Sequence, residues 1–288
     1  MTLNCNGKIL DLHTKKIMGI INLSQDSFYD GGKYDSIDKV NARITNLVSN
    51  GAEIIDIGAA SSKPGSKLID SKKELDIESD YIIELSNNFR NIHLSIDTYN
   101  SGVAEFALSK GFSIVNDISA GRYDSNIFNV VKDYNSGYIL MHMLGDPENM
   151  QENPEYDNVV KSIQIFLKTK IQKLQELGFD NIIIDPGFGF GKSIDDNFKI
   201  LKELESFQTL NRPIIVGLSR KSMIYKTLKI TPEESLNGTT ALNILALERG
   251  ANILRVHDAK EALQCICLLY TSDAADERSS VDLGGRRI

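Results

Sequence analysis

The sequence predicts an α/β fold, a single-domain (β/α)8 TIM barrel whose eighth helix is truncated. Eight short apolar runs rich in β-prone residues recur along the chain, and each leads to polar residues able to do chemistry. Near-continuous apolar runs are typical of strands buried on both faces, as in a parallel sheet. Segments with helical spacing separate them, and eight strand–helix units in roughly 260 residues match a barrel.

The runs are each followed closely by residues suited to a site, and this shared position predicts where the site lies. They are residues 16–21 before Asn22, 53–57 before Gly58 and Ser61, 93–96 before Asp97, 113–115 before Asn116, 138–141 before His142, 182–184 before Asp185, 213–216 before Ser219 and Lys221, and 252–254 before Arg255 and His257. The carboxyl ends of barrel strands share one face, where active sites of this fold sit. We therefore expect these polar residues to converge.

The helices are predicted from apolar spacing and from their ends. They span residues 37–49, 71–87, 102–110, 157–177, 194–207 and 239–249. Glycine follows the last periodic residue of several of them, at Gly51, Gly111, Gly178 and Gly250, as expected of helix C-termini.

The sixth run carries the clearest chemical signal. It leads Asp185 into the loop Pro186-Gly187-Phe188-Gly189-Phe190-Gly191-Lys192. Such a glycine-rich loop leaves open space beside the carboxylate, which indicates a pocket for a flat ligand.

Composition excludes several classes of function. The net charge of -7 and the pI near 5.2 argue against nucleic acid as a partner, which favours a basic face. No run reaches the ~18 apolar residues of a membrane span, and the N-terminus lacks a secretory pattern. Cys5, Cys265 and Cys267 form no disulfide framework or metal-ligand spacing. We expect a cytoplasmic protein.

Eight motifs, in order, resemble the dihydropteroate synthase family of pterin-binding barrels. They are residues 18–32, 56–65, 96–99, 116–118, 141–143, 185–192, 219–222 and 255–258, within a match from about 16 to 262. Each motif alone is weak, but eight in register are specific. The resemblance implies a folate-pathway transferase that joins 6-hydroxymethyl-7,8-dihydropterin diphosphate to 4-aminobenzoate, releasing diphosphate and 7,8-dihydropteroate. It also implies Mg²⁺ as cofactor, and a homodimer if the surface of the C-terminal helix survives.

The resemblance places the pterin among residues from several strand ends. Asp97, Asn116 and Asp185 are expected to bind the ring edge, whose donors and acceptors suit carboxylates and amides. Met141 and Phe190 are expected to cover its faces, with Gly217 and Lys221 beside it. The alternative interpretation is that Asp97 and Asn116 cap helices or hold loops.

The diphosphate is expected at the first, second and eighth strand ends. The resemblance assigns it Asn22, Ser62, Lys63, Arg255 and His257, with Asn22 also touching the magnesium ion. Arg255 and His257 are alternate residues of one strand and therefore point the same way. The alternatives are an ion pair of Arg255 with Asp258 or another acid, and a core histidine at position 257.

The 4-aminobenzoate pocket is expected to involve Phe28, Pro64, Ser219 and Ser222, the last at a helix N-terminus that favours a carboxylate. The loops carrying Phe28 and Pro64 could instead be plain polar connectors. The arylamine is itself the nucleophile, so no Ser/His/Asp arrangement is required. Catalytic roles are expected for Asp97, Asp185, Lys221, Arg255 and His257.

The chain departs from the family pattern at several loop positions. Gln25 stands where a proline is usual, Ala60 and Ser62 replace a common Glu and Thr, Lys63 replaces an Arg, and Leu144 replaces an Arg. Lys63 keeps the charge but lacks the planar fork that grips phosphate bidentately. The predicted pterin residues are intact.

The C-terminal end is predicted to lie outside the barrel. Residues 1–266 form the pterin-binding barrel, whereas residues 267–288 resemble the translation of a sequencing adapter joined to a truncated reading frame. We expect nothing after Ile266 to contribute to the active face.

Two other classes of function are compatible with the pterin residues. A methyltransferase barrel that hands a methyl group from methyltetrahydrofolate to a corrinoid partner shares them, but residues 219–222 and the pair Arg255 and His257 argue against it. A non-catalytic pterin-binding module is the second. A measurement of diphosphate release with both substrates present would distinguish the three functions.

Overall fold

The computed structural model describes residues 1–23, 36–59, 65–150, 152 and 154–282. The barrel strands are β3 (Lys16–Asn22), β4 (Ile54–Gly58), β5 (His93–Asp97), β6 (Ile114–Asp117), β7 (Gly137–Met141), β8 (Ile182–Asp185), β9 (Ile215–Val216) and β10 (Ile253–Val256). They form one parallel sheet in the order β8-β7-β6-β5-β4-β3-β10-β9. A parallel bridge between Ile184 and Ile214 joins its two edges. The predicted (β/α)8 barrel is confirmed.

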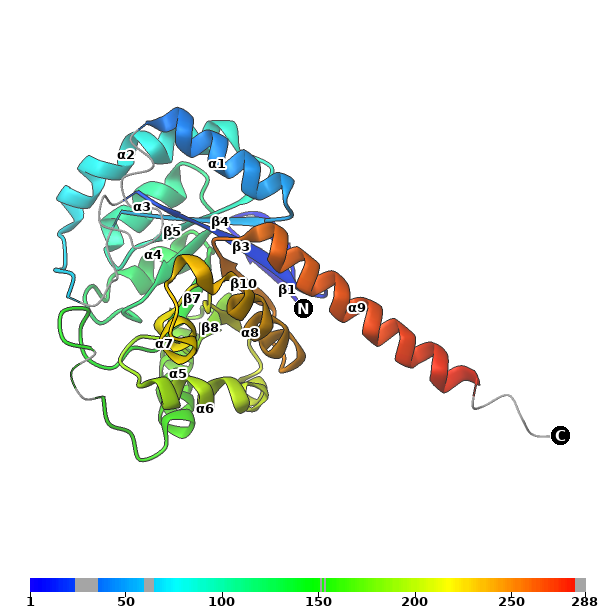
Figure 1. Cartoon of the computed structure of the whole chain (residues 1–288). Helices are drawn as coiled ribbons and strands as arrows, with labels where there is room; N and C mark the ends of the chain where they lie inside the picture. The colour runs from blue at the N-terminus through cyan, green and yellow to red at the C-terminus, as the bar shows by residue number, and fades with distance from the viewer. Residues whose placement is uncertain (24–35, 60–64, 151, 153, 283–288) are drawn as a thin grey trace.

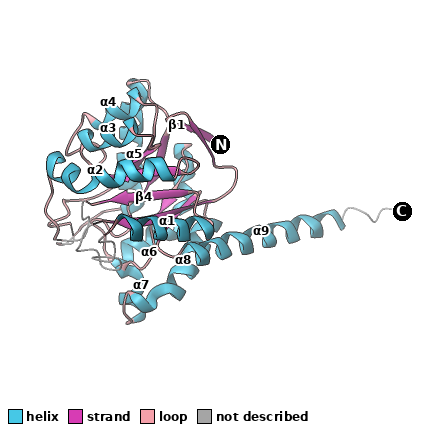
Figure 2. Ribbon diagram, turned by 90° about the horizontal axis from the view of Figure 1, so that it is seen from above, coloured by secondary structure: helices cyan, strands magenta, loops and turns pink. Residues whose placement is uncertain are grey.

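Helices surround this sheet (Figures 1 and 2). They are α1 (Ile37–Ser49), α2 (Ser71–Asn88), α3 (Ser101–Ser109), α4 (Ile127–Asp133), α5 (Val159–Glu176), α6 (Ile194–Lys202), α7 (Ser222–Leu228), α8 (Leu236–Glu248) and α9 (Ala259–Asp282), with short 3₁₀ helices η1 (Leu204–Leu210) and η2 (Glu233–Ser235). The predicted helix 194–207 divides into α6 and η1. None of the described helices is long and apolar enough to cross a membrane.

An N-terminal hairpin, which the sequence interpretation did not include, precedes the barrel. Its strands β1 (Thr2–Cys5) and β2 (Lys8–Asp11) pair antiparallel around Asn6 and Gly7. Both turn residues have positive φ, 51° and 80°, and Asn-Gly favours a tight turn of this kind. The Asn6-Gly7 dipeptide is therefore the sequence signal from which the hairpin could have been predicted.

The hairpin packs against the interior of the barrel. Its apolar side chains form one buried cluster with residues from seven strands: Leu3, Cys5, Leu10, Leu12, Met18, Ile54, Ile114, Ile139, Ile183, Ile215 and Ile253. We call this cluster the apolar plug. It fills the barrel below the strand ends, so a site can form only above it.

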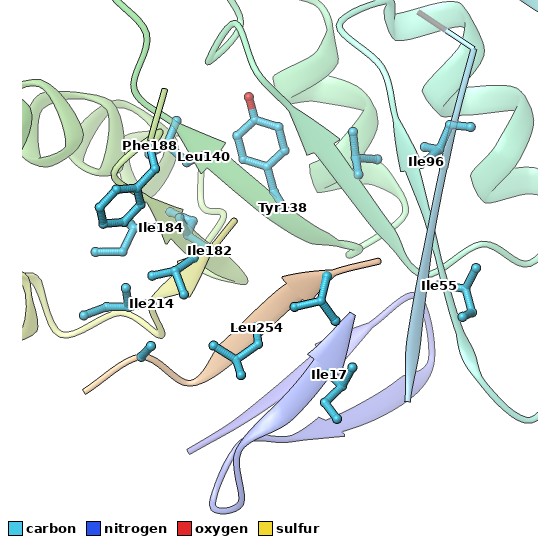
Figure 3. Packing of buried hydrophobic residues seen from close by; sticks show 14 of the residues in the cluster. Ile17, Ile55, Ile96, Tyr138, Leu140, Ile182, Ile184, Phe188, Ile214 and Leu254 are labelled. Atoms are coloured by element: carbon cyan, nitrogen blue, oxygen red, sulfur yellow. The ribbon is translucent and has the colours of Figure 1, made fainter. Parts of the chain in front are cut away.

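A second apolar layer lies outside the strands, beneath the helices. Side chains alternate between the two faces of a strand, so Ile17 and Ile55 point outward although Met18 and Ile54 belong to the plug. Figure 3 shows part of this outer cluster. Burial on both faces explains why the strands have near-continuous apolar sequences.

Strand β9 is the shortest in the barrel, and the flanking residues explain its length. Pro213 has no N–H to donate to a ladder, although its carbonyl accepts from Ile184 N at 2.9 Å. The side chain of Asn252 then accepts from Ile214 N at 2.9 Å in place of a backbone partner. The sheet therefore closes with few regular ladder bonds.

The last helix is longer than the sequence interpretation expects. Helix α9 continues past Ile266 to Asp282, and Figure 1 shows it extending away from the barrel. Leu269 packs against the main core, and Tyr270 Oη accepts from Lys15 N at 2.7 Å. The spacing Ala259, Ala262, Ile266 and Leu269 is helical, a pattern that the sequence interpretation overlooked.

Candidate active site

Strand alternation raises the site residues above the plug. Six strands place a site position two residues beyond a plug residue: Asp56 after Ile54, Asn116 after Ile114, Met141 after Ile139, Asp185 after Ile183, Gly217 after Ile215, and Arg255 after Ile253. Residues two apart on a strand share a face. The same geometry that fills the bottom of the barrel with isoleucine therefore brings the polar groups together at its carboxyl end.

Asp56 lies at the centre of the polar network. Its Oδ2 accepts from Arg255 Nε at 2.7 Å and from Asn116 Nδ2 at 2.9 Å. Its Oδ1 accepts from Ser95 Oγ at 2.6 Å, and the side chain is buried. The sequence interpretation assigned Asp56 no role. Its position inside an apolar strand could have identified it, because a buried carboxylate needs charged or hydrogen-bonding partners.

Arg255 pairs with two carboxylates. Besides Asp56, it contacts Asp97 Oδ2 through Nη2 at 2.7 Å. Burial alone would lower the pKa of Arg255, but the charges of Asp56 and Asp97 raise it, so the guanidinium is permanently charged. Burial raises the pKa of Asp97, and Arg255 opposes that rise. The acids that pair with Arg255 are therefore Asp56 and Asp97, whereas Asp258 pairs with Arg220.

Asn116 has an orientation that its neighbour fixes. A carboxylate can only accept, so the amide must turn Nδ2 toward Asp56, which leaves Oδ1 as the acceptor for a ligand. Neither Asn116 nor Asp97 lies at a helix N-cap position, since Asn100 holds that position in α3 and Asn126 in α4. The helix-capping part of the alternative is wrong for these two residues.

Asp185 is held at the start of the glycine-rich loop. Its Oδ1 accepts from Gly187 N at 2.7 Å, which leaves Oδ2 to face other donors. Burial raises the pKa of Asp185, and Lys221 opposes the rise. Gly187 has φ +72°, and a Cβ there would lie 1.9 Å from His142 O, so no other residue fits.

A buried lysine fixes the rest of this loop. Lys192 Nζ donates to the carbonyls of Gly187 at 2.8 Å, Phe190 at 2.9 Å and His142 at 3.2 Å, and it lies 3.1 Å from His142 Nδ1. Burial lowers the pKa of Lys192 to about 7 and that of His142 to about 3. The sequence interpretation included Lys192 in a motif but gave it no role. Its contacts shape the loop that carries Phe190.

Lys221 contacts the same glycine-rich loop from the strand end of β9. Its Nζ donates to Phe188 O and lies 4.8 Å from the centroid of the Phe190 ring. A Cβ on Gly217 would lie 3.7 Å from Nζ, so glycine leaves this side open. Burial lowers the pKa of Lys221 to about 8, although the charge of Asp185 opposes the fall.

An apolar cluster lies at the carboxyl end of β7. Met141 packs there with other buried residues, and Phe190 packs against them; the remaining members are Tyr99, Ile118, Met143, Met150 and Tyr123. The predicted pair Met141 and Phe190 is therefore brought together. Aromatic and thioether groups of this kind suit the face of a flat ring.

His257 is held by Ser219. The hydroxyl of Ser219 accepts from His257 N at 3.3 Å and lies 3.0 Å from His257 Nδ1. Burial, aided by the charge of Arg255, lowers the pKa of His257 to about 3, so the ring is neutral at physiological pH. In the tautomer whose Nδ1 accepts from the Ser219 hydroxyl, the ring proton is on Nε2, which is then a donor.

The loop between β9 and α7 is held in place by an ion pair. Arg220 makes a two-point ion pair with Asp258, with Nε and Nη2 at 2.9 and 3.0 Å from its carboxylate oxygens. Arg220 Nη1 also donates to Pro232 O at 3.1 Å. This pair brings Ser222, the first residue of α7, to the same end of the barrel.

The first strand supplies Asn22 at its carboxyl end, half-buried. Among the described residues, no three His, Cys, Asp or Glu side chains converge to hold a metal ion. An amide oxygen at a strand end fits a Mg²⁺ ion held mainly by substrate phosphates, not one held by an all-protein cage. The predicted residues Phe28, Ser62, Lys63 and Pro64, and the departures Gln25 and Ala60, lie outside the described residues.

Comparisons with known proteins agree with this geometry. The family model described as "Pterin binding enzyme" matches residues 18–257. The dihydropteroate synthase of Escherichia coli K12 is 33% identical over 279 residues, covering 96% of this chain and 98% of that protein. The Yersinia pestis dihydropteroate synthase with a sulfonamide drug superposes with a TM-score of 0.91 at 33% identity, covering 96% of this chain and 100% of that one. The Xanthomonas albilineans enzyme in complex with 7,8-dihydropteroate gives 0.84 at 33% identity, covering 95% and 99%.

Proposed function

Because the chain belongs to the pterin-binding enzyme family, we propose that it is a dihydropteroate synthase, a transferase of folate biosynthesis. It would join 6-hydroxymethyl-7,8-dihydropterin diphosphate to 4-aminobenzoate and release diphosphate and 7,8-dihydropteroate. The observation that carries the proposal is the convergence of Asn116, Asp185 and Lys221 beside an apolar wall that includes Phe190. A pterin is flat and has a polar edge, so it requires both features.

The pterin edge would pair with fixed groups. Asp185 Oδ2 would accept hydrogen bonds from N–H groups of the ring. Asn116 Oδ1, whose orientation is set by Asp56, would accept another. Lys221, whose Nζ lies 4.8 Å from the Phe190 ring centroid, supplies a cation beside the proposed ring site. A site of this kind rejects rings lacking the polar edge, because its own buried groups would be left unpaired.

The leaving diphosphate would meet donors at the end of β10. Arg255 is permanently charged, and His257 presents Nε2–H without changing its charge. These groups are fixed before the carbon–oxygen bond breaks, so they stabilise developing charge without reorganising. Mg²⁺, held by Asn22 and the diphosphate itself, would supply further neutralising charge.

The second substrate would enter beside α7. Its carboxylate is proposed to meet Ser222 and neighbouring backbone N–H groups, while Phe28 and Pro64 belong to the predicted wall. The amine attacks the methylene carbon that the diphosphate leaves, so the enzyme needs to position substrates and exclude water. A sulfonamide resembles 4-aminobenzoate, which agrees with the drug named for the Yersinia structure.

Diphosphate release with both substrates present tests the proposal. We expect release that requires 4-aminobenzoate and is inhibited by a sulfonamide. A pterin-dependent methyltransferase or a non-catalytic pterin binder releases none. We further expect a cytoplasmic homodimer, which size-exclusion chromatography with light scattering would detect.

A further inference from the structure

Helix α2 buries two glutamates on the side facing the site. Glu74 and Glu78 are each 0% exposed, and their spacing of four residues places them on one helix face. Glutamate is almost never fully buried unless it is paired. Among the described residues, no ion pair involves either side chain, so their burial requires another explanation.

Each glutamate uses one oxygen and leaves the other unsatisfied. Glu78 Oε1 accepts from the backbone N–H of Ala59, and Glu74 Oε2 accepts from Asn100 Nδ2 at 2.5 Å. Within the described part of the chain, Glu74 Oε1 and Glu78 Oε2 have no hydrogen-bond partner. Burial raises the pKa of Glu78 well above its usual range, and the neighbouring acids Glu74, Asp97 and Asp56 add to the rise. Burial and the neighbouring acids therefore both favour the neutral form of the Glu78 carboxyl.

The residue that Glu78 holds is part of a structural corner. Gly58, the last residue of β4, accepts from Leu23 N at 2.9 Å, directly after Asn22. A Cβ on Gly58 would lie 2.9 Å from both Cβ and O of Asp97, so this residue packs tightly against the neighbouring strand. The Gly58–Ala59 corner therefore joins the ends of β3, β4 and β5, two residues beyond Asp56.

Glu78 reaches this corner from α2 and accepts from the N–H of Ala59, the residue that follows β4. Its carboxyl therefore holds the backbone at the point where the strand ends. We propose that Glu78 is a positioning residue, which fixes the Gly58–Ala59 corner and thereby Asp97, against which Gly58 packs.

This inference rests on the proposed function, since its readout is the synthase reaction. The variants at position 78 are chosen by whether they keep a hydrogen-bond acceptor. An amide mimics the neutral form of the carboxyl, which burial favours: Gln keeps the acceptor for Ala59 N and replaces the O–H with N–H. Val has a similar shape near the backbone but accepts nothing, so the Ala59 N–H would be buried without a partner.

The experiment measures kcat and KM for the pterin diphosphate, with thermal unfolding as a check on folding. We expect Glu78→Val to lower kcat/KM about tenfold, chiefly through KM. Glu78→Gln should retain at least half of the wild-type value. Glu84→Val, the same change on the exposed face of α2, is the matched control and should behave as wild type.

Glu78→Leu, which fills more of the space and also lacks an acceptor, takes the place of Glu78→Val if that variant does not fold. The inference is overturned if the folded variant without an acceptor keeps wild-type KM, or if Glu78→Gln loses as much kcat/KM as that variant. An inactive wild-type protein would instead overturn the proposed function.

Discussion

Asp56 and Arg255 are joined across the barrel, from β4 to β10, although β3 lies between them in the sheet. The Nε···Oδ2 distance is 2.7 Å, and the same carboxylate oxygen orients Asn116. One buried residue that contacts no predicted ligand atom therefore sets the direction of a predicted pterin group and of a predicted diphosphate group.

Removing Asp56 should cost both stability and function. We expect Asp56→Ala to destabilise the fold by about 3–5 kcal/mol, because breaking a buried ion pair leaves uncompensated charge. Asp56→Asn, which keeps an acceptor, should cost less. Urea unfolding measures both, and Asp180→Ala is the control, since its partnership with Arg212 is at the surface and is worth at most about 1 kcal/mol. Equal losses at positions 56 and 180 would contradict the network.

Asp185 should be required for pterin binding. In Asp185→Asn, an acceptor becomes a donor facing donors, so we expect affinity for a dihydropterin to fall on the order of 100-fold or more. Isothermal calorimetry measures this, with exposed Asp195→Asn on α6 as the control. Unchanged affinity in Asp185→Asn would remove the basis for the pterin site.

The barrel and the strand-end residues were predictable because both follow from local patterns. Apolar runs mark the strands, and the polar residue that follows a run marks the site, as at Asp97 and Asp185. Asp56 was missed because it lies one residue before the end of its run, where only the register of β4 shows that it points inward.

Other features depend on contacts between distant segments. Ser219 was predicted for 4-aminobenzoate, but its contact with His257 forms only when β9 and β10 pair. Lys192 finds three carbonyls because its loop folds back on His142. No spacing in the sequence specifies such contacts.

Lys192 should give stability a pH dependence of predictable sign. Its folded pKa of about 7 lies below the usual 10.5, so the unfolded chain holds more protons between these values. Stability contributed by this group therefore rises with pH across that window. Lys192→Met removes the rise, so its deficit in unfolding free energy should be larger at pH 9 than at pH 7. Exposed Lys199→Met should show no such difference, and a pH-independent deficit at Lys192 would contradict the prediction.

Lys221 should limit activity at alkaline pH. Burial lowers its pKa to about 8, so its positive charge is present below that value and lost above it. We expect kcat/KM to fall as pH rises through about 8. Asp97 also titrates under the influence of burial, so the test is Lys221→Arg, which keeps its charge: its profile should lack the alkaline fall that depends on position 221. A wild-type fall that persists unchanged in Lys221→Arg would assign it to another group.

The C-terminal helix should divide into a part that stabilises the barrel and a part that does not. Leu269 packs on the core and Tyr270 accepts from Lys15 N, so deleting residues 267–288 removes partial burial and one hydrogen bond. We expect about 1–3 kcal/mol of lost stability, which lowers the melting temperature by several degrees for a chain of this size. Deleting only residues 273–288 should leave it within about a degree. Leu269→Ala should reproduce part of the loss, whereas Leu268→Ala, at a side chain 67% exposed, should not. If both deletions melt at the wild-type temperature, the contacts of Leu269 and Tyr270 contribute nothing, and the barrel ends functionally at Ile266.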